Sequence, residues 1–235
     1  MKKSVFAAVV AVAVGFITAV VLCVQTLYAP QPVFSQAQAG MTVVVDAGHG
    51  GIDGGVTGKK TGKKESDLNL AIAFCLKTAL EDKGFSVILT RKTEAGLYDT
   101  TAKGFKKRDM QRRREIIEAI KPDFVLSLHQ NFYPSRSSRG AQVFYKKDSA
   151  NGERLAALTQ EKLNGLYAGQ GVKARKATAG EFFMLDCSTA PSLLIECGFL
   201  SNPADEALLV SSAWQRKLAE TVASSVLAYL SNDMA

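Results

Sequence analysis

The chain alternates between short apolar runs and longer segments whose apolar residues recur every three or four positions. The short runs are rich in valine, isoleucine, leucine and phenylalanine and predict strands. These strands are expected at residues 43–45, 85–89, 124–128, 141–145, 182–185 and 192–195. The longer segments predict helices, which are expected at residues 66–83, 106–120, 151–166 and 213–230, with a further helix beginning at Pro203.

The order of these elements predicts the fold class. Strands and helices alternate along the chain, which is typical of a largely parallel sheet covered by helices on both faces. We therefore expect an α/β fold, a single three-layer domain built on a mostly parallel, twisted sheet of about six strands. No internal repeat interrupts this pattern.

Polar residues mark where several of the predicted helices begin and end. Ser66 or Asp67 can accept hydrogen bonds from the free N–H groups of the first helix, and Gly84 follows its end. Asn202 precedes a proline and two acidic residues, which is a strong signal for a helix start. Pro122 ends the basic helix predicted before it.

The beginning of the chain differs in composition from the remainder. Two lysines precede residues 5–24, an almost wholly apolar segment of about 20 residues that is long enough to span a bilayer. An A-x-A sequence at residues 37–39 is a site at which a signal peptidase can cut. We expect residues 1–40 to be a signal peptide or membrane anchor plus linker, and residues 41–235 to be an exported domain.

The formal net charge is +7, and several of the basic residues are clustered. The helix predicted at residues 106–120 contains three consecutive arginines, residues 112–114, which we interpret as a solvated helix face. A basic surface suits an anionic polymer. A nucleic-acid ligand is disfavoured, because the domain is expected to be exported and the basic helix lacks interleaved aromatic residues.

Both histidines of the chain and two glutamates stand where predicted elements begin or end. His49 and His129 each follow a strand, Glu65 precedes a helix, and Glu196 ends the apolar sequence SLLIE. The carboxyl ends of strands in an open parallel sheet are the usual place for chemistry. Two histidines and a carboxylate can hold a catalytic zinc ion and leave its fourth position open to water, whose pKa the metal lowers to about 7.

Glu196 is a candidate for proton transfer at such a site. A carboxylate at the end of an apolar strand is costly to bury unless it is paired or close to a metal ion. A second carboxylate of this kind can move a proton from the attacking water to the leaving nitrogen. Each of the four residues also has a structural explanation as an ordinary polar side chain, and it is their coincidence that favours a metal site.

Several motifs, taken in order, resemble those of the zinc-dependent N-acetylmuramoyl-L-alanine amidases of the amidase-3 family. The similarity covers roughly residues 42–230. Its motifs are VVVDAGHGGIDGG at 43–55, E-x-D-L-N-L-A-I-A at 65–73, LTR at 89–91, SLHQN at 127–131 and PSLLIECGFLSN at 191–202. Ala47 stands where the family usually has proline, Gln130 where alanine is commoner, and Glu118 where asparagine is usual.

The resemblance implies one zinc ion per domain, held by His49, Glu65 and His129, with Glu196 as the catalytic acid and base. The implied reaction is hydrolysis of the amide bond between N-acetylmuramic acid and L-alanine of the peptidoglycan stem peptide. The glycines around His49 would leave room for this bulky glycopeptide. Further residues expected to contact the substrate are Lys59, Lys63, Arg112, Asn131 and Arg136.

The apolar leader and the sequence RGAQVFY at residues 139–145 are most similar to the spore-cortex amidases of endospore formers, the CwlD type. That similarity implies removal of peptide stems as the first step towards muramic-δ-lactam, with a role in sporulation and germination. The protein is then expected outside the cytoplasmic membrane, anchored to it or secreted to the cell wall or forespore intermembrane space. Control of zinc loading or site access by a regulatory protein partner stays an open alternative.

Two other functions stay open at this point. A zinc peptidase acting on another cell-wall peptide would use the same ligands, although the order of the motifs does not favour it. A non-catalytic cell-wall-binding protein would be expected to have lost Glu196 or a metal ligand, and all four residues are present.

Overall fold

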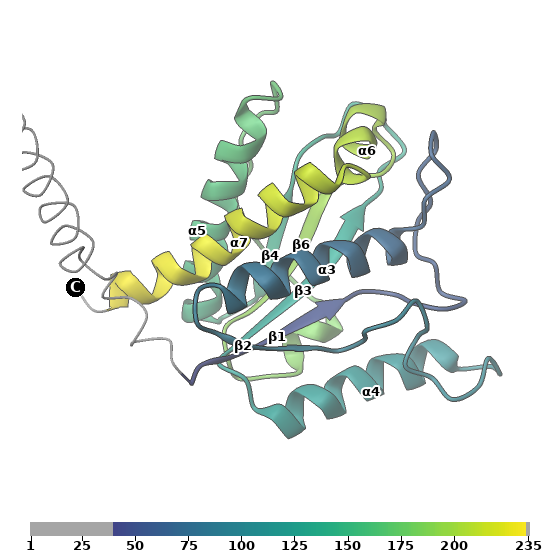
Figure 1. Ribbon diagram of the computed structural model, residues 1–235, viewed down its shortest axis with the longest axis vertical. Helices are drawn as coiled ribbons and strands as arrows, with labels where there is room; N and C mark the ends of the chain where they lie inside the picture. The colour runs from purple at the N-terminus through teal and green to yellow at the C-terminus, as the bar shows by residue number, and fades with distance from the viewer. Residues whose placement is uncertain (1–39, 234–235) are drawn as a thin grey trace, which may run out of the picture. The chain divides into compact units, whose positions relative to one another are not determined.

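A computed structural model describes residues 40–233 of the chain, and the leader predicted before them lies outside the described residues. The described part contains a six-stranded sheet with helices on both faces (Figure 1). The strands are β1 (Thr42–Ala47), β2 (Ser86–Leu89), β3 (Phe124–Asn131), β4 (Gln142–Lys146), β5 (Thr178–Gly180) and β6 (Ser192–Phe199). The helices are α3 (Glu65–Glu81), α4 (Phe105–Ile120), α5 (Ala150–Ala168), α6 (Pro203–Leu209) and α7 (Ser212–Asp233), with a 3₁₀ helix η1 (Phe183–Asp186). None of these helices is long and apolar enough to cross a membrane.

The sheet is mostly parallel, which confirms the predicted α/β class. Its strand order is β2-β1-β3-β6-β4-β5. Neighbouring strands from β2 to β6 are parallel, and β4 runs antiparallel to β6 and parallel to β5. Because parallel strands end at the same edge of a sheet, the carboxyl ends of β1, β3 and β6 lie side by side.

The side chains of each strand alternate between two cores, one on each face of the sheet. Val43 and Val45 of β1 belong to the larger core, which α3, α5 and α7 cover (Figure 1). Val44 belongs to a smaller core on the opposite face, together with Ile117 of α4 and Met184 of η1. Since successive side chains of a strand point to opposite faces, the smaller core shows which strand residues face α4 and η1.

The strand predicted at residues 182–185 is wrong. Residues 183–186 form η1, and the fifth strand is β5, a segment for which no strand was expected. β5 pairs with residues 144–146 of β4 and so occupies the free edge of the sheet. The apolar residues after it are left without a strand to pair with, and they fold back as a 3₁₀ turn that buries Met184 and Leu185.

The two predicted helix starts have different outcomes. Asn202 caps α6, because its side-chain oxygen accepts hydrogen bonds from the first backbone N–H groups of that helix. The cap predicted for α3 is wrong, since α3 begins at Glu65, before Ser66 and Asp67. Carbonyl groups of the preceding loop accept the N–H groups of Glu65 and Ser66 at 2.8 and 3.1 Å, so the helix needs no side-chain cap.

Candidate metal centre

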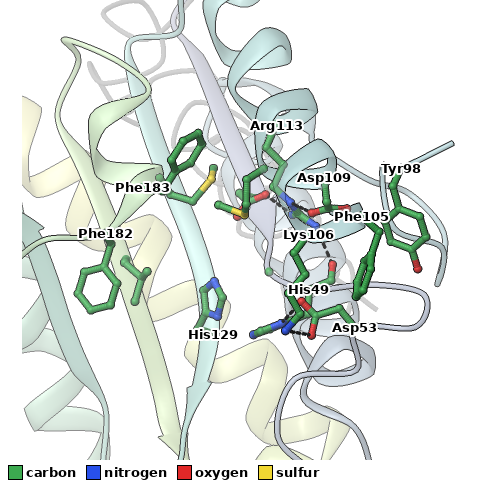
Figure 2. Close-up of a pocket in the computed structure, with 15 residues that line it drawn as sticks. His49, Asp53, Tyr98, Phe105, Lys106, Asp109, Arg113, His129, Phe182 and Phe183 are labelled. Carbon is green, nitrogen blue, oxygen red and sulfur yellow. Dashed lines mark hydrogen bonds and ion pairs between the residues drawn. The ribbon is translucent and has the colours of Figure 1, made fainter. Parts of the chain in front are cut away.

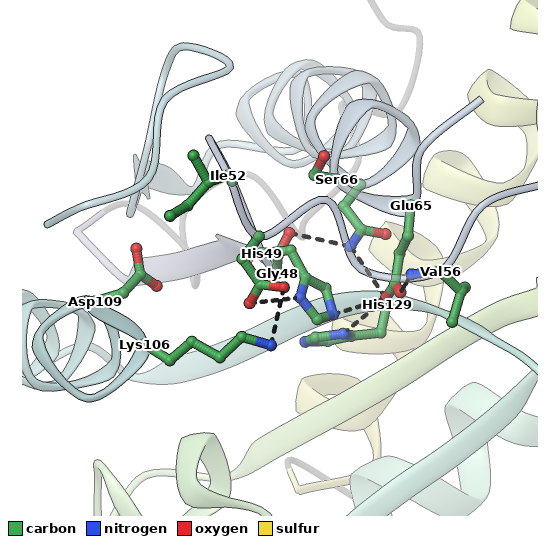
Figure 3. A network of polar contacts seen from close by, with 12 residues as sticks. Gly48, His49, Ile52, Val56, Glu65, Ser66, Lys106, Asp109 and His129 are labelled. Carbon is green, nitrogen blue, oxygen red and sulfur yellow. Dashed lines mark hydrogen bonds and ion pairs between the residues drawn. The ribbon is translucent and has the colours of Figure 1, made fainter. Parts of the chain in front are cut away.

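The structure brings His49, Glu65 and His129 together at the carboxyl edge of the sheet (Figure 3). Glu65 Oε1 lies 3.3 Å from His49 Nε2 and 3.0 Å from His129 Nδ1. The three groups come from the loop after β1, the first turn of α3 and the end of β3, and one ligand atom from each lies within 4.8 Å of the others. Two imidazole nitrogens and a carboxylate oxygen at this spacing fit a zinc ion with an open coordination position.

The charges of the three groups support one another. Burial raises the pKa of Glu65, but hydrogen bonds and charge interactions with the two histidines outweigh burial and hold that pKa well below its usual range. Burial lowers the pKa of His49, and contacts with Glu65 and Asp53 outweigh it, so the net shift is upward. The cluster therefore keeps Glu65 as a carboxylate, which is the form that binds a metal ion.

A second carboxylate orients the His49 ring. Asp53 Oδ2 lies 3.1 Å from His49 Nδ1, and its other oxygen lies 3.2 Å from the ammonium group of Lys106. This contact occupies the Nδ1 atom and leaves Nε2 directed at Glu65. A carboxylate on the outer nitrogen of a metal-binding histidine sets its tautomer and strengthens it as a ligand.

Two buried arginines hold the backbone that carries His49. His49 has a left-handed backbone conformation with φ of 62°, which is unfavourable for a residue other than glycine. Arg113 donates to the carbonyl oxygens of Ala47 and His49 at 2.8 and 2.7 Å. Arg91 donates to the carbonyl oxygens of Ala47 and Gly48 at 2.8 and 3.1 Å. These bonds stabilise the strained conformation in which His49 faces Glu65.

The burial of Arg113 corrects the prediction that the arginine run is a solvated helix face. The Arg113 side chain is 1% exposed, whereas that of Arg112 is 62% exposed and pairs with its helix neighbour Glu115. Arg113 pairs with Asp46 at 2.5 Å and with Asp109 at 2.7 Å. It lies three residues after Met110 and four before Ile117, so the sequence places it on the buried stripe of α4.

The glycines near His49 make room for the site itself. A Cβ atom at Gly48 would overlap the ring of His129. A Cβ atom at Gly55 would overlap the carboxylate of Glu65, and its φ of 66° is also one that glycine favours. The expectation that these glycines leave space for a ligand is therefore wrong at both positions, where the space is occupied by predicted metal ligands.

Glu196 lies beside this cluster. It is the register partner of His129 on the neighbouring strand β6, and both residues fall on the side of the sheet that faces α4 and η1. Its Oε2 atom is buried and has no hydrogen-bond partner among the described residues. Burial, together with the charge of Glu65, raises the pKa of Glu196 to about 7, although the two histidines oppose that shift. A carboxyl group with this pKa can both accept and release a proton near neutrality.

A pocket opens beside the two histidines, between α4 and the η1 segment (Figure 2). Its volume is about 280 Å³. Beside charged residues that include Asp53, Lys106 and Arg113, its lining contains the apolar and aromatic side chains of Tyr98, Phe105, Met110, Phe182, Phe183, Met184 and Leu194. The sequence did not identify this pocket, because its walls come from a loop, a helix and a 3₁₀ turn that only tertiary packing brings together.

The other residues expected to contact a substrate are not among those that line this pocket. Asn131 lies at the end of β3, where its carbonyl oxygen accepts a hydrogen bond from Leu200. Lys63 and Arg136 are exposed on loops. Lys59 lies over the ring of Phe132, 5.6 Å from its centroid. Contact of these four residues and of Arg112 with a substrate stays a prediction. Asp53 and Lys106, by contrast, belong to the site although the sequence did not indicate them.

Comparisons with known proteins agree on one family. The family model described as N-acetylmuramoyl-L-alanine amidase matches residues 43–228. The germination-specific N-acetylmuramoyl-L-alanine amidase of Bacillus subtilis (strain 168) is 33% identical over 194 residues, which are 81% of this chain and 80% of that protein.

Solved structures give the same result. The CwlD amidase from Clostridioides difficile, in complex with the GerS lipoprotein, has a TM-score of 0.77 and 34% identity, covering 81% of this chain and 98% of that one. The catalytic domain of CwlV, an N-acetylmuramoyl-L-alanine amidase from Bacillus (Paenibacillus) polymyxa var. colistinus, has a TM-score of 0.69 and 27% identity, covering 81% and 98% respectively.

Proposed function

The chain belongs to the N-acetylmuramoyl-L-alanine amidase family, and we propose that it hydrolyses the amide bond between N-acetylmuramic acid and L-alanine with the help of zinc. The observation that carries the proposal is the convergence of His49 Nε2 and His129 Nδ1 on one oxygen of Glu65. These three residues would hold the metal ion. When bound, zinc would polarise the scissile carbonyl group and lower the pKa of the attacking water.

Glu196 would carry the protons of this reaction. Its carboxylate, next to His129, would accept a proton from the attacking water and then donate it to the departing amine of L-alanine. Burial raises the pKa of this carboxyl group in the metal-free site, which favours a group that acts as base and then as acid, and a bound zinc ion would lower the pKa from that value. The unpaired Oε2 atom leaves this side chain free to bond with a reactant.

The other polar residues of the site would act through the metal ligands. Asp53 would hold the His49 ring in the tautomer that presents Nε2 to the metal. Arg113 and Arg91 would hold the backbone of that histidine, and the apolar walls of the adjoining pocket would limit access of bulk water. A site held this firmly stabilises the transition state with little reorganisation.

We further propose a role in spore cortex maturation, as the step that leads to muramic-δ-lactam. The support is the similarity to a germination-specific amidase and to a CwlD structure. The substrate would be peptidoglycan, and the CwlD complex with a lipoprotein supports a protein partner for this chain as well. Cell-wall amidases act outside the cytoplasmic membrane, so residues 1–40 would be a signal peptide or membrane anchor with a linker, and residues 41–235 the catalytic domain.

Two substitutions test the zinc site and the proton carrier separately. His129→Ala should lose bound zinc, measured by metal analysis, together with release of peptides from purified peptidoglycan. Glu196→Gln should keep zinc and lose peptide release. Zinc retained at full occupancy by His129→Ala would contradict the ligand set, and turnover retained by Glu196→Gln would contradict its role as acid and base. Binding of peptidoglycan by the unaltered protein without any release would favour the non-catalytic alternative.

A further inference from the structure

The pocket between α4 and η1 has apolar walls and one exposed cation. Arg113 forms its buried end, where the guanidinium is already paired with Asp46 and Asp109. Lys106 also lines the pocket (Figure 2). Its side chain is 65% exposed. The ammonium group of Lys106 has three N–H donors and uses one on Asp53. Two donors are therefore left to bind a ligand that enters the pocket.

The shape of the pocket favours a branch of the substrate over its main chain. The glycan strand of peptidoglycan continues in both directions from every muramic acid, so it needs a groove that is open at both ends. The stem peptide is a branch that starts at the scissile amide bond. A pocket of about 280 Å³ beside His49 and His129, bounded by a helix and a 3₁₀ turn, fits the first residues of such a branch.

The chemistry of the pocket fits the same residues. The first residue of the stem, L-alanine, has a methyl group that suits the walls formed by Phe105 and Met110. The second, a γ-linked D-glutamate, has an α-carboxylate only one residue beyond the scissile bond. The carboxylate of Asp53 lies between Lys106 and His49. One of its oxygens is 3.2 Å from Lys106 Nζ, and the other is 3.1 Å from His49 Nδ1. One residue spans about 3.3–3.6 Å when extended, so both groups are within reach of one short peptide.

We propose that this pocket receives the first two residues of the stem peptide and that Lys106 binds the α-carboxylate of the second. The inference rests on the proposed amidase function and adds a specificity determinant to it. A free carboxylate would be preferred over the corresponding amide, because only the carboxylate forms a charge-assisted hydrogen bond with the ammonium group.

The test compares two muropeptides that differ only in whether this carboxyl group is free or amidated. The zinc-loaded protein should cleave the free acid with a kcat/KM about 10-fold higher, as expected for one charge-assisted hydrogen bond. In Lys106→Ala this ratio should fall to near 1. In Lys107→Ala, the exposed neighbouring lysine, the ratio should equal that of the unaltered protein.

The possible outcomes separate this inference from the proposed function. Equal cleavage of the two muropeptides by the unaltered protein would overturn the inference and leave the amidase function standing. A proportional loss on both muropeptides in Lys106→Ala, with the ratio unchanged, would also overturn it, because Lys106 would then act only through Asp53 and His49. Cleavage of neither muropeptide by the unaltered protein would contradict the amidase function and the inference together.

Discussion

The guanidinium group of Arg113 donates a hydrogen bond of 2.7 Å to the carbonyl oxygen of His49. A residue of α4 thereby supports the backbone of a proposed metal ligand that lies 64 positions away in the chain. The same guanidinium group pairs with Asp46 and Asp109, so that one buried cation joins β1, α4 and the loop after β1. Correct assembly of the site therefore depends on how α4 packs against the sheet.

Replacement of this buried cation should strongly destabilise the fold. Arg113→Leu leaves the buried Asp46 and Asp109 without their partner, and breaking a buried ion pair in this way costs about 3–5 kcal/mol. The matched control is Arg112→Leu, since that side chain is exposed and should change stability by no more than about 0.5 kcal/mol. Chemical denaturation of the metal-free proteins gives both values, and equal effects of the two substitutions would contradict the assigned role of Arg113.

The contrast between these two arginines shows what the sequence could predict. His49, His129 and Glu196 could be grouped because each follows a predicted parallel strand, and the carboxyl ends of such strands share one edge of the sheet. The burial of Arg113 is indicated more weakly by the sequence. Arg113 lies between Met110 and Ile117 on the apolar stripe of α4, but the run of three arginines suggested an exposed face.

Asp53 and Lys106 could not be identified in this way. Asp53 lies within a recognised motif, but no spacing rule shows that its carboxylate meets the outer nitrogen of His49. Lys106 meets Asp53 only because α4 packs beside the loop after β1. The 3₁₀ turn η1 could not be predicted either, because it depends on tertiary pairing. The apolar run at 182–185 favours a strand locally, but β5 already pairs with β4 at that edge of the sheet.

Loss of the carboxylate that orients His49 should weaken metal binding. Asp53→Ala should lower zinc affinity about 10–100-fold, which is the usual effect of removing a partner of a metal-binding histidine. Competition with a chromogenic chelator measures this affinity. Glu94→Ala is the control, because its exposed side chain is on a loop whose backbone contacts Gly51. Unchanged zinc affinity in Asp53→Ala would show that Asp53 does not act through His49.

A methyl group at Gly48 should disrupt the site. Gly48→Ala places a Cβ atom against the ring of His129, so that ring must move away from Glu65. We expect zinc affinity to fall at least ~10-fold and stability to fall by about 1–3 kcal/mol. Gly165→Ala in α5 is the matched control, because no other atom lies within 4 Å of the added Cβ. That substitution should leave zinc binding intact and stabilise the protein by about 0.5–1 kcal/mol.

Neutralising Glu196 should stabilise the metal-free protein by an amount that grows as the pH rises from 4.5 to about 7. The pKa of Glu196 is raised from 4.5 to about 7 in the folded protein, so the folded state binds more protons than the unfolded state between these values. Stability therefore falls as the pH rises through this range and levels off above it. Glu196→Gln removes that loss, and its free energy of unfolding should exceed that of the unaltered protein by about 1–3 kcal/mol at pH 8.

The same pair of proteins should have nearly equal stability at pH 4, where Glu196 is protonated in both the folded and the unfolded state. Urea denaturation in the presence of a chelator at the two pH values gives the comparison. An equal difference at both pH values would show that Glu196 is not destabilised as a carboxylate in the folded protein.

Mass spectrometry of the products released from purified peptidoglycan tests the central claim most directly, with and without a zinc chelator. The site described here predicts stem peptides with a free N-terminal L-alanine and glycan strands of unchanged length, with release abolished by the chelator and restored by added zinc. Peptides cut within the stem, glycan strands with new reducing ends, or undiminished release in the chelator would contradict it.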